Sequence, residues 1–419
     1  MDASHPGGAA VPPSADASPR GARFPIFPFL SVLLLLLLAI LTTLAGCAGR
    51  IAPPDRNGVL PLRTVWMRQL QPQWREDLFR PMQYSSPAVS DGVVYMGDDQ
   101  NIFWAFKAAD GAVLWKFGSY GPVECTPVVV ENLVIFGDGD GYVYALDRRT
   151  GFVKWTYRVQ GQVMGRLITD GKLVFVRTNH ERLYAVTVAD GKWKWMQSRE
   201  LPSGFTIRGV SSPTLDGDRV LNGFADGYLL AFNKNSGTEV FKTMLEKGER
   251  FVDIDSTPIV DGNSIYVASY SGSVYALSRE NAAVQWVFNH GSVQRVAIVG
   301  DRLFVSDNEG FARALDKANG HELWSFDLRE YDEKQSLYED SRRKLVAPTN
   351  PVPYHDLLLI GSSNGFLYAL DQRDGRLRWQ FWPGFGMTAE TIVDGDAIYM
   401  HTNFGNLYCL KPNLEYGLK

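Results

Sequence analysis

Few residues in this 419-residue chain have the types and spacing that catalysis or metal binding needs. Its histidines beyond the first five residues are scattered, without the spacing typical of a zinc site; they are His180, His290, His321, His355 and His401. Carboxylates show no calcium-loop spacing, and Gly-x-Ser-x-Gly, Walker and His-Glu-x-x-His motifs do not occur. We therefore expect no catalytic residue, no metal site, no cofactor and no enzyme activity.

Two short stretches carry a sharper signal, because each combines charge with apolar side chains. The residues concerned are Phe205, Ile207, Arg208, Asp253 and Asp255. If both stretches lead into the inner strands of neighbouring repeats, Arg208 should face the two aspartates. An arginine beside aromatic and apolar groups is typical of a protein-binding hot spot. A salt bridge that only orders the loops explains the same residues equally well.

A repeated element must position these stretches. Its fullest copy is Tyr144–Trp155, and six further copies end at Trp115, Trp195, Phe241, Trp286, Trp324 and Trp379. Every copy has an alanine ten residues before the closing aromatic, and six copies have a glycine four residues before it. The exception is Ala282. The glycine marks a hairpin turn, and a small residue at fixed offset from a large one suits packing between sheets.

Two more strand signals precede each copy, which makes four strands per unit and predicts a propeller blade. An eighth unit begins at Thr388 and reaches Leu410 without an outer strand of its own. Near the start, Thr64–Met67 forms an unpaired strand with Trp66 at the cassette position. We predict an all-β, eight-bladed propeller of four-stranded antiparallel blades, with the ring closed by this N-terminal strand.

The N-terminal region resembles a bacterial lipoprotein signal. Arg20 and Arg23 precede an apolar run of twelve residues, too short for a comfortable membrane span, and Leu44-Ala-Gly-Cys47 follows as a lipobox. The resemblance implies cleavage before Cys47, acylation of that thiol and, with Ala48 next, a lipid anchor at the outer membrane. An uncleaved anchor with a coincidental cysteine is the alternative. The expected domains are a signal peptide with a disordered leading region at 1–46, a lipidated tether at 47–62 and the propeller at 63–419.

The net charge is −4, and removal of residues 1–46 leaves it unchanged because that segment has two Asp and two Arg. A mildly acidic chain does not favour nucleic acid as a partner. Cys125 and Cys409 lie in different blades, so we expect two buried free thiols in place of a disulfide. The charged joint at 325–347 is most simply a solvated excursion.

The cassette resembles the tryptophan-docking motif of quinoprotein dehydrogenases, which are eight-bladed propellers that bind pyrroloquinoline quinone with calcium. The motif is structural, so it indicates the propeller and not the enzyme. That family has a pair of adjacent cysteines beside the quinone, whereas no two cysteines are adjacent here.

The lipobox, the eight docking-motif blades and the joints Ile207-Arg-Gly209 and Asp253–Pro258 together resemble the BamB lipoproteins of the outer-membrane β-barrel assembly machinery. The likeness covers about Thr64 to Leu410. It implies a non-catalytic scaffold on the periplasmic face of the outer membrane, whose residues Phe205, Ile207, Arg208, Asp253 and Asp255 contact the barrel subunit BamA. The alternatives are a propeller lipoprotein of another envelope complex and a quinoprotein dehydrogenase.

Overall fold

The structure is a computed structural model that describes residues 50–51, 62–70, 82–200, 211–248, 251–270, 272–330, 347–363, 365–384 and 386–413. All of them belong to one compact unit, Gly49–Lys419. Within these ranges, no helix combines the length and the apolar character that a membrane crossing requires.

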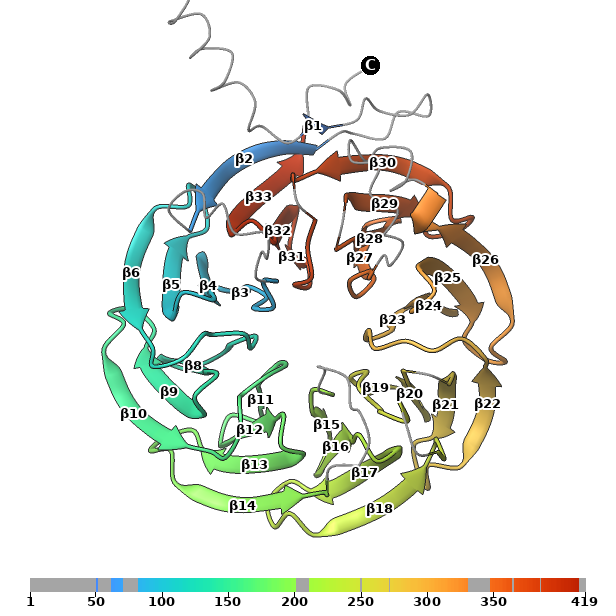
Figure 1. The fold of residues 1–419 in the computed structure, drawn as a ribbon, viewed down its shortest axis with the longest axis horizontal. Helices are drawn as coiled ribbons and strands as arrows, with labels where there is room; N and C mark the ends of the chain where they lie inside the picture. The colour runs from blue at the N-terminus through green and yellow to red at the C-terminus, as the bar shows by residue number, and fades with distance from the viewer. Residues whose placement is uncertain are drawn as a thin grey trace, which may run out of the picture. The chain divides into compact units, whose positions relative to one another are not determined.

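Eight antiparallel sheets are arranged in a ring, with the first strand of each sheet nearest the centre (Figure 1). Blades 1 to 4 are β3 (Ala88–Ser90), β4 (Val93–Gly97), β5 (Ile102–Lys107) and β6 (Val113–Gly118); β7 (Val128–Val130), β8 (Leu133–Gly137), β9 (Tyr142–Asp147) and β10 (Val153–Arg158); β11 (Ile168–Thr169), β12 (Leu173–Thr178), β13 (Arg182–Thr187) and β14 (Trp193–Ser198); and β15 (Thr214–Asp216), β16 (Arg219–Gly223), β17 (Tyr228–Asn233) and β18 (Glu239–Met244). The predicted all-β, eight-bladed architecture is confirmed.

The second half of the ring repeats the pattern. Blades 5 to 8 are β19 (Ile259–Asp261), β20 (Ser264–Ala268), β21 (Val274–Ser278) and β22 (Val284–Phe288); β23 (Ala297–Val299), β24 (Arg302–Ser306), β25 (Phe311–Asp316) and β26 (Glu322–Asp327); β27 (Val352–Tyr354), β28 (Leu357–Gly361), β29 (Leu367–Asp371) and β30 (Leu377–Trp382); and β31 (Ile392–Asp394), β32 (Ala397–His401), β33 (Asn406–Pro412) and β2 (Leu62–Gln69). Blade 7 gains a fifth strand that the sequence does not predict, because β1 (Arg50–Ile51) pairs with β30.

The burial of the strands follows from their place in a blade. The two middle strands of blade 2, β8 and β9, are buried on both faces, because neighbouring blades cover them. Continuous apolar runs such as Leu133–Phe136 are therefore expected there. The outer strand β10 has a side that faces solvent, and its residues are mostly exposed apart from Trp155. The core is accordingly a chain of apolar layers between blades.

The closing tryptophan of one blade docks on the turn glycine of the next. Gly151 has a φ of +76°, and a Cβ there would lie 2.8 Å from the Trp115 ring. The Trp115 indole Nε1–H donates to the Arg148 carbonyl of the same turn at 3.1 Å. The equivalent pairs are Trp66 with Gly111, Trp155 with Gly191, Trp195 with Gly237, Trp286 with Gly320 and Trp324 with Gly375. Glycine is needed at this position both for the left-handed backbone and for the space that the ring takes.

The two exceptions to the cassette belong to neighbouring blades. Phe241 closes blade 4 in place of tryptophan, and the turn of blade 5 has Ala282, whose φ is +56°. Phenylalanine has no N–H, so the carbonyl at this turn, Arg279, accepts from the Nη2 of Arg219 at 2.9 Å. The Arg219 guanidinium also lies 5.7 Å from the Phe241 ring centroid. The exception is therefore compensated, since arginine supplies the missing donor.

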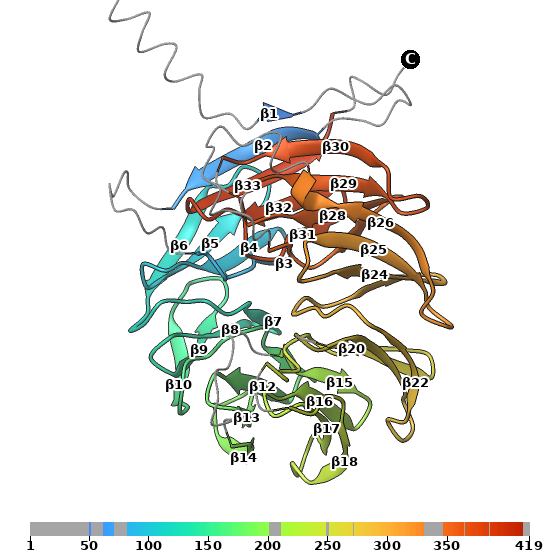
Figure 2. The ribbon, with the colours of Figure 1, turned by 45° about the vertical axis from the view of Figure 1, so that its right-hand side comes forward.

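The ring closes as predicted. β2 pairs antiparallel with β33, and Trp66 lies opposite Cys409 in the register (Figures 1 and 2). Trp66 is buried, and its Nε1–H donates to the Ala108 carbonyl of blade 1 at 2.9 Å. The two ends of the propeller are thus joined by the same contact that joins the other blades, and blade 8 gains the outer strand that it otherwise lacks.

Candidate functional site

The connections from an outer strand to the next inner strand leave one end of the blades. Of the predicted contact residues, Asp253 and Asp255 lie in the connection between β18 and β19. Phe205, Ile207 and Arg208 lie outside the described residues, as does the predicted lipidation residue Cys47. The contact that the sequence predicts between Arg208 and the aspartates therefore stays a prediction.

Asp253 and Asp255 are both buried, with only 2% and 7% of their surface exposed. The backbone around them is held from two blades. The Ile254 N–H donates to the Phe224 carbonyl of blade 4 at 3.1 Å, and the Tyr270 N–H of blade 5 donates to the Asp253 carbonyl at 3.0 Å. The two carboxyl groups are therefore part of the inside of the joint, which the sequence did not reveal.

A buried ion pair lies close enough to influence them. The Arg177 Nη2 donates to Glu181 Oε2 at 2.7 Å, and its Nη1 donates to the Thr178 carbonyl at 2.6 Å. The guanidinium lies 4.7 Å from the ring centroid of Phe224. Glu181 Oε2 also accepts from the Ala225 N–H at 2.9 Å, which ties blade 3 to blade 4.

Sequence reasoning missed Arg177 and Glu181. The available signal is the arginine inside the otherwise apolar strand Leu173–Thr178, because a charge in such a strand is costly unless it is paired.

Burial raises the pKa of Asp255 to about 8. The negative charges of Asp253 and Glu181 raise it further, and the Arg177 guanidinium opposes them. Among the described residues, Asp255 Oδ2 has no hydrogen-bond partner. The Asp255 carboxyl group is therefore mostly protonated at neutral pH, so it can act as a hydrogen-bond donor.

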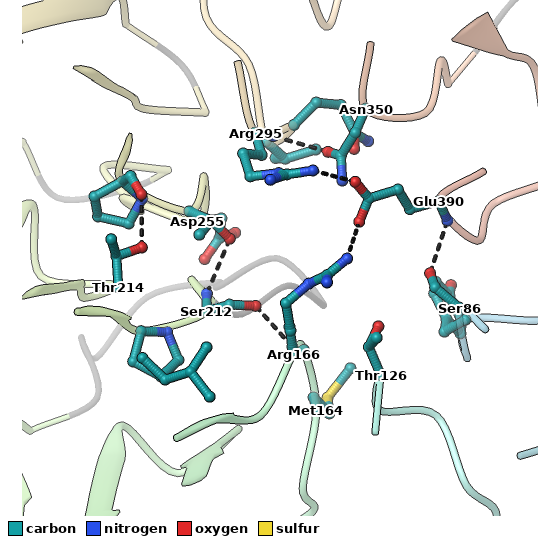
Figure 3. A pocket seen from close by; sticks show the side chains of 18 of the residues that line it. Ser86, Thr126, Met164, Arg166, Ser212, Thr214, Asp255, Arg295, Asn350 and Glu390 are labelled. Carbon is teal, nitrogen blue, oxygen red and sulfur yellow. Dashed lines mark hydrogen bonds and ion pairs between the residues drawn. The ribbon is translucent and has the colours of Figure 1, made fainter. Parts of the chain in front are cut away.

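Asp255 also lines a central cavity of about 650 Å³, to which the inner ends of several blades contribute (Figure 3). In the cavity wall, Arg166 and Arg295 approach Glu390 from opposite sides. The Arg166 Nη2 donates to Glu390 Oε2 at 2.7 Å, and the Arg295 Nη2 donates to Oε1. We call Arg166, Glu390 and Arg295 the central triad. Its members precede blades 3, 8 and 6, which are not neighbours, so the triad bridges the ring across its middle.

The triad is held by its surroundings. The Glu390 N–H donates to Ser86 Oγ, and the Arg166 N–H donates to Ser212 Oγ, both at 2.8 Å. Burial by itself would raise the pKa of Glu390, but the Arg166 and Arg295 guanidiniums outweigh burial and hold that pKa below its ordinary value. Glu390 is therefore ionised at neutral pH, and the triad is a cross-channel brace between charges.

One group of side chains has ligands that a metal ion accepts, namely His290, Asp307 and Glu309. The Arg313 Nε donates to Asp307 Oδ2, and Asp307 Oδ1 accepts from the Glu309 and Phe311 N–H groups. Both Asp307 oxygens are thus engaged, and an arginine already supplies the positive charge. The group is a structural ion pair, and it carries no metal-site proposal.

The two cysteines of the propeller are free and buried, as expected. Burial raises the pKa of the Cys125 thiol to about 12. Its sulfur lies 3.2 Å from both the N–H and the carbonyl of Gly137, so the thiol takes part in the packing of the first strand of blade 2. A protonated, buried thiol is unreactive.

The chain matches the family model for the outer membrane protein assembly factor BamB over residues 63–161, 125–326 and 313–381. BamB of Shewanella oneidensis is 26% identical over 242 residues, which are 56% of this chain and 58% of that protein. BamB of Yersinia pestis is 24% identical over 352 residues, which are 80% of this chain and 76% of that protein. The chain therefore matches less than two thirds of the Shewanella relative's length.

Solved structures agree on the fold. The crystal structure of BamB from Moraxella catarrhalis superimposes with a TM-score of 0.69 at 21% identity, covering 84% of this chain and 99% of that one. A quinohemoprotein alcohol dehydrogenase from Pseudomonas putida HK5 gives a TM-score of 0.66 at 14% identity, covering 84% of this chain and 76% of that one. At these identities the likeness concerns the propeller fold alone. Because the family model covers most of the ring, from residue 63 to residue 381, this chain belongs to the BamB family of outer membrane protein assembly factors.

Proposed function

We propose that this protein is a non-catalytic scaffold of the outer-membrane β-barrel assembly complex. The observation that carries the proposal is the family match over residues 63–381, which includes both joints singled out in the sequence. The quinoprotein alternative shares the fold, but no observation beyond the fold favours it.

The proposed partner is a BamA-like barrel subunit, bound through the connections on one face of the propeller. Phe205, Ile207 and Arg208 are the proposed contact residues on the first joint. Asp253 and Asp255 are the proposed residues on the second joint, and their burial suits a share in shaping that joint as well as in contacting the partner. A joint held from two blades presents its surface with little loss of conformational entropy on binding, which favours affinity.

We further propose that Cys47 is acylated and holds the propeller at the periplasmic face of the outer membrane. Two or more lipid chains on one cysteine would give stable anchoring without a membrane span. The Cys47→Ser variant tests this directly, because it should no longer sediment with membranes. Retention of that variant in the detergent phase would favour the uncleaved anchor instead.

The test of the partner is affinity purification of the full chain from detergent-solubilised membranes. The Arg208→Ala variant should lose the barrel subunit while its melting temperature stays close to that of the wild type, since hot-spot truncations commonly weaken binding by about 2 kcal/mol or more. Arg149→Ala is the matched control, because Arg149 is exposed in the turn between β9 and β10, at the other end of a blade.

Three results would count against the proposal. Loss of stability with retained binding would make the joint a brace only. Copurification of a different envelope complex, without the barrel subunit, would favour the second alternative. A bound chromophore after addition of quinone and calcium would favour the enzyme.

A further inference from the structure

A second surface lies on the same end of the blades, at the rim between blades 1 and 2. It consists of Tyr120, Tyr142 and Arg158, which we call the rim cluster. Tyr120 lies in the connection between β6 and β7, whereas Tyr142 begins β9 and Arg158 ends β10. The two tyrosine ring centroids are 4.7 Å apart, and the Arg158 guanidinium lies 4.9 Å from the centroid of Tyr142.

The rim cluster is exposed although it contains aromatic rings. Tyr120 has 69% of its surface exposed, and Arg158 is exposed as well. Among the described residues, the Tyr120 hydroxyl group makes no hydrogen bond and Arg158 contacts no carboxylate; the arginine donates only to the Tyr142 hydroxyl, at 3.4 Å. An exposed ring pair with an uncompensated cation is an unusual way for a soluble surface to end.

Other arginines of this protein show what is missing. In the part of the chain that the structure describes, six arginines stack on aromatic rings. Five of them also pair with a carboxylate: Arg177 with Glu181, Arg199 with Asp226, Arg219 with Asp216, Arg313 with Asp307, and Arg329 with Asp327. Arg158 is the sixth, and its ring contact is made without a carboxylate.

The closest comparison is with Tyr228 and Phe311, which begin β17 and β25 as Tyr142 begins β9. The arginines stacked on those two rings are neutralised within the chain. The vacancy at Arg158 is therefore a property of blade 2 and not of the repeat.

The rim cluster is also rigid. The Tyr120 N–H donates to the Tyr144 hydroxyl, and its carbonyl accepts from Asn101 Nδ2, both at 3.1 Å. Tyr144 in turn donates to Asp138 at 2.7 Å, and Asp138 accepts from the Gly121 N–H. Tyr120 is thus held before any partner arrives, and a rigid aromatic residue gives contact area at low entropic cost.

We propose that the rim cluster is a second protein-docking point, and that it receives a partner segment bearing a carboxylate beside an apolar side chain. The carboxylate would complete Arg158 as the internal carboxylates complete the other stacked arginines, and the apolar side chain would cover Tyr120. A neutral sugar would leave Arg158 unpaired. The net charge of −4 disfavours a polyanion such as nucleic acid.

This docking point is separate from the joints that hold Arg208 and Asp255, so it stands or falls apart from the proposed function. The first experiment places a photoreactive benzophenone amino acid at Tyr120 of the full chain in its own cell envelope. The same residue at Phe152 is the matched control, because Phe152 is a 74% exposed aromatic in the turn at the other end of blade 2. Mass spectrometry then maps the partner peptide.

We expect a protein adduct at Tyr120 that is absent at Phe152, on a segment with Asp or Glu near the cross-link. A synthetic copy of that segment should bind the purified chain, and Arg158→Glu should weaken binding at least about tenfold. Replacing the peptide's carboxylates by amides should have a similar effect, whereas Arg149→Glu should have none. Arg208→Ala should leave the Tyr120 adduct unchanged.

Three outcomes would overturn the inference: no adduct above the Phe152 control, adducts with lipid or glycan only, or a peptide that binds the Arg158→Glu variant as tightly as the wild type.

Discussion

The rim and the centre of this propeller are built on different principles. Around the rim, one contact recurs: a tryptophan of one blade covers the turn glycine of the next and donates to its carbonyl. At the centre, nothing recurs, and charged residues such as Glu390, Arg166 and Asp255 each occur once. The comparison teaches that the repeat carries the architecture, while the non-repeated joints carry what distinguishes this propeller from others of the same fold.

The largest effect should come from breaking the rim contact that closes the ring. Trp66→Ala removes a buried ring from between blades 8 and 1, and we expect a loss of about 3–5 kcal/mol in the free energy of unfolding. Urea denaturation measures it. Trp193→Ala is the control, because Trp193 is 57% exposed on an outer strand and its loss should cost less than about 0.5 kcal/mol. Equal effects in the two variants would refute closure by β2.

A central change should cost less. Glu390→Gln removes the charge that Arg166 and Arg295 share, and we expect a loss of about 1.5–3 kcal/mol at neutral pH. The pKa of Glu390 is lowered in the folded protein, so its contribution is present above the ordinary pKa of 4.5 and is lost as the pH falls through the folded value. The gap between variant and wild type should therefore close in acid, and a gap independent of pH would contradict the ionised brace. Glu200→Gln, at an exposed position, is the control.

Asp255 should give the centre a pH dependence of the opposite sign. Its pKa is about 8 when folded and 3.8 ordinarily, so folding takes up a proton between these values. The free energy of unfolding should fall as the pH rises through that window, by at most about 1.4 kcal/mol per pH unit from this group.

Asp255→Asn should flatten that slope in denaturation curves measured across the window, and the exposed Asp140→Asn should not. An unchanged slope in the Asp255→Asn variant would show that Asp253, Glu181 and Arg177 do not control the titration as inferred.

The smallest effect concerns the exception at the rim. Gly151→Ala places a Cβ against Trp115 in a left-handed turn and should cost about 1–2 kcal/mol from the backbone alone. Ala282→Gly makes the reverse change where Phe241 replaces tryptophan, and it should stabilise the protein by less than about 1 kcal/mol. Thermal melts of both variants measure the difference. A loss of stability in Ala282→Gly would mean that the alanine methyl group is needed at this interface.

Most of the rim could be predicted from the sequence, and most of the centre could not. The cassette fixes an alanine, a glycine and a tryptophan at constant offsets, so the blades, their number and the role of Trp66 follow from counting. The charged residues have no such periodicity. Arg166, Arg295 and Glu390 are 129 and 95 positions apart in turn, from the residue numbers, and only ring closure brings them together.

The sequence by itself determined the eight-bladed ring, its closing strand and its two free thiols, because local spacing and turn chemistry repeat in every blade. The tertiary structure alone decided the burial of Asp253 and Asp255, the central triad and the uncompensated Arg158. A single residue's burial and charge partners depend on which distant joints meet it in space. Those meetings are set by the geometry of the closed ring, to which no local pattern of residues corresponds.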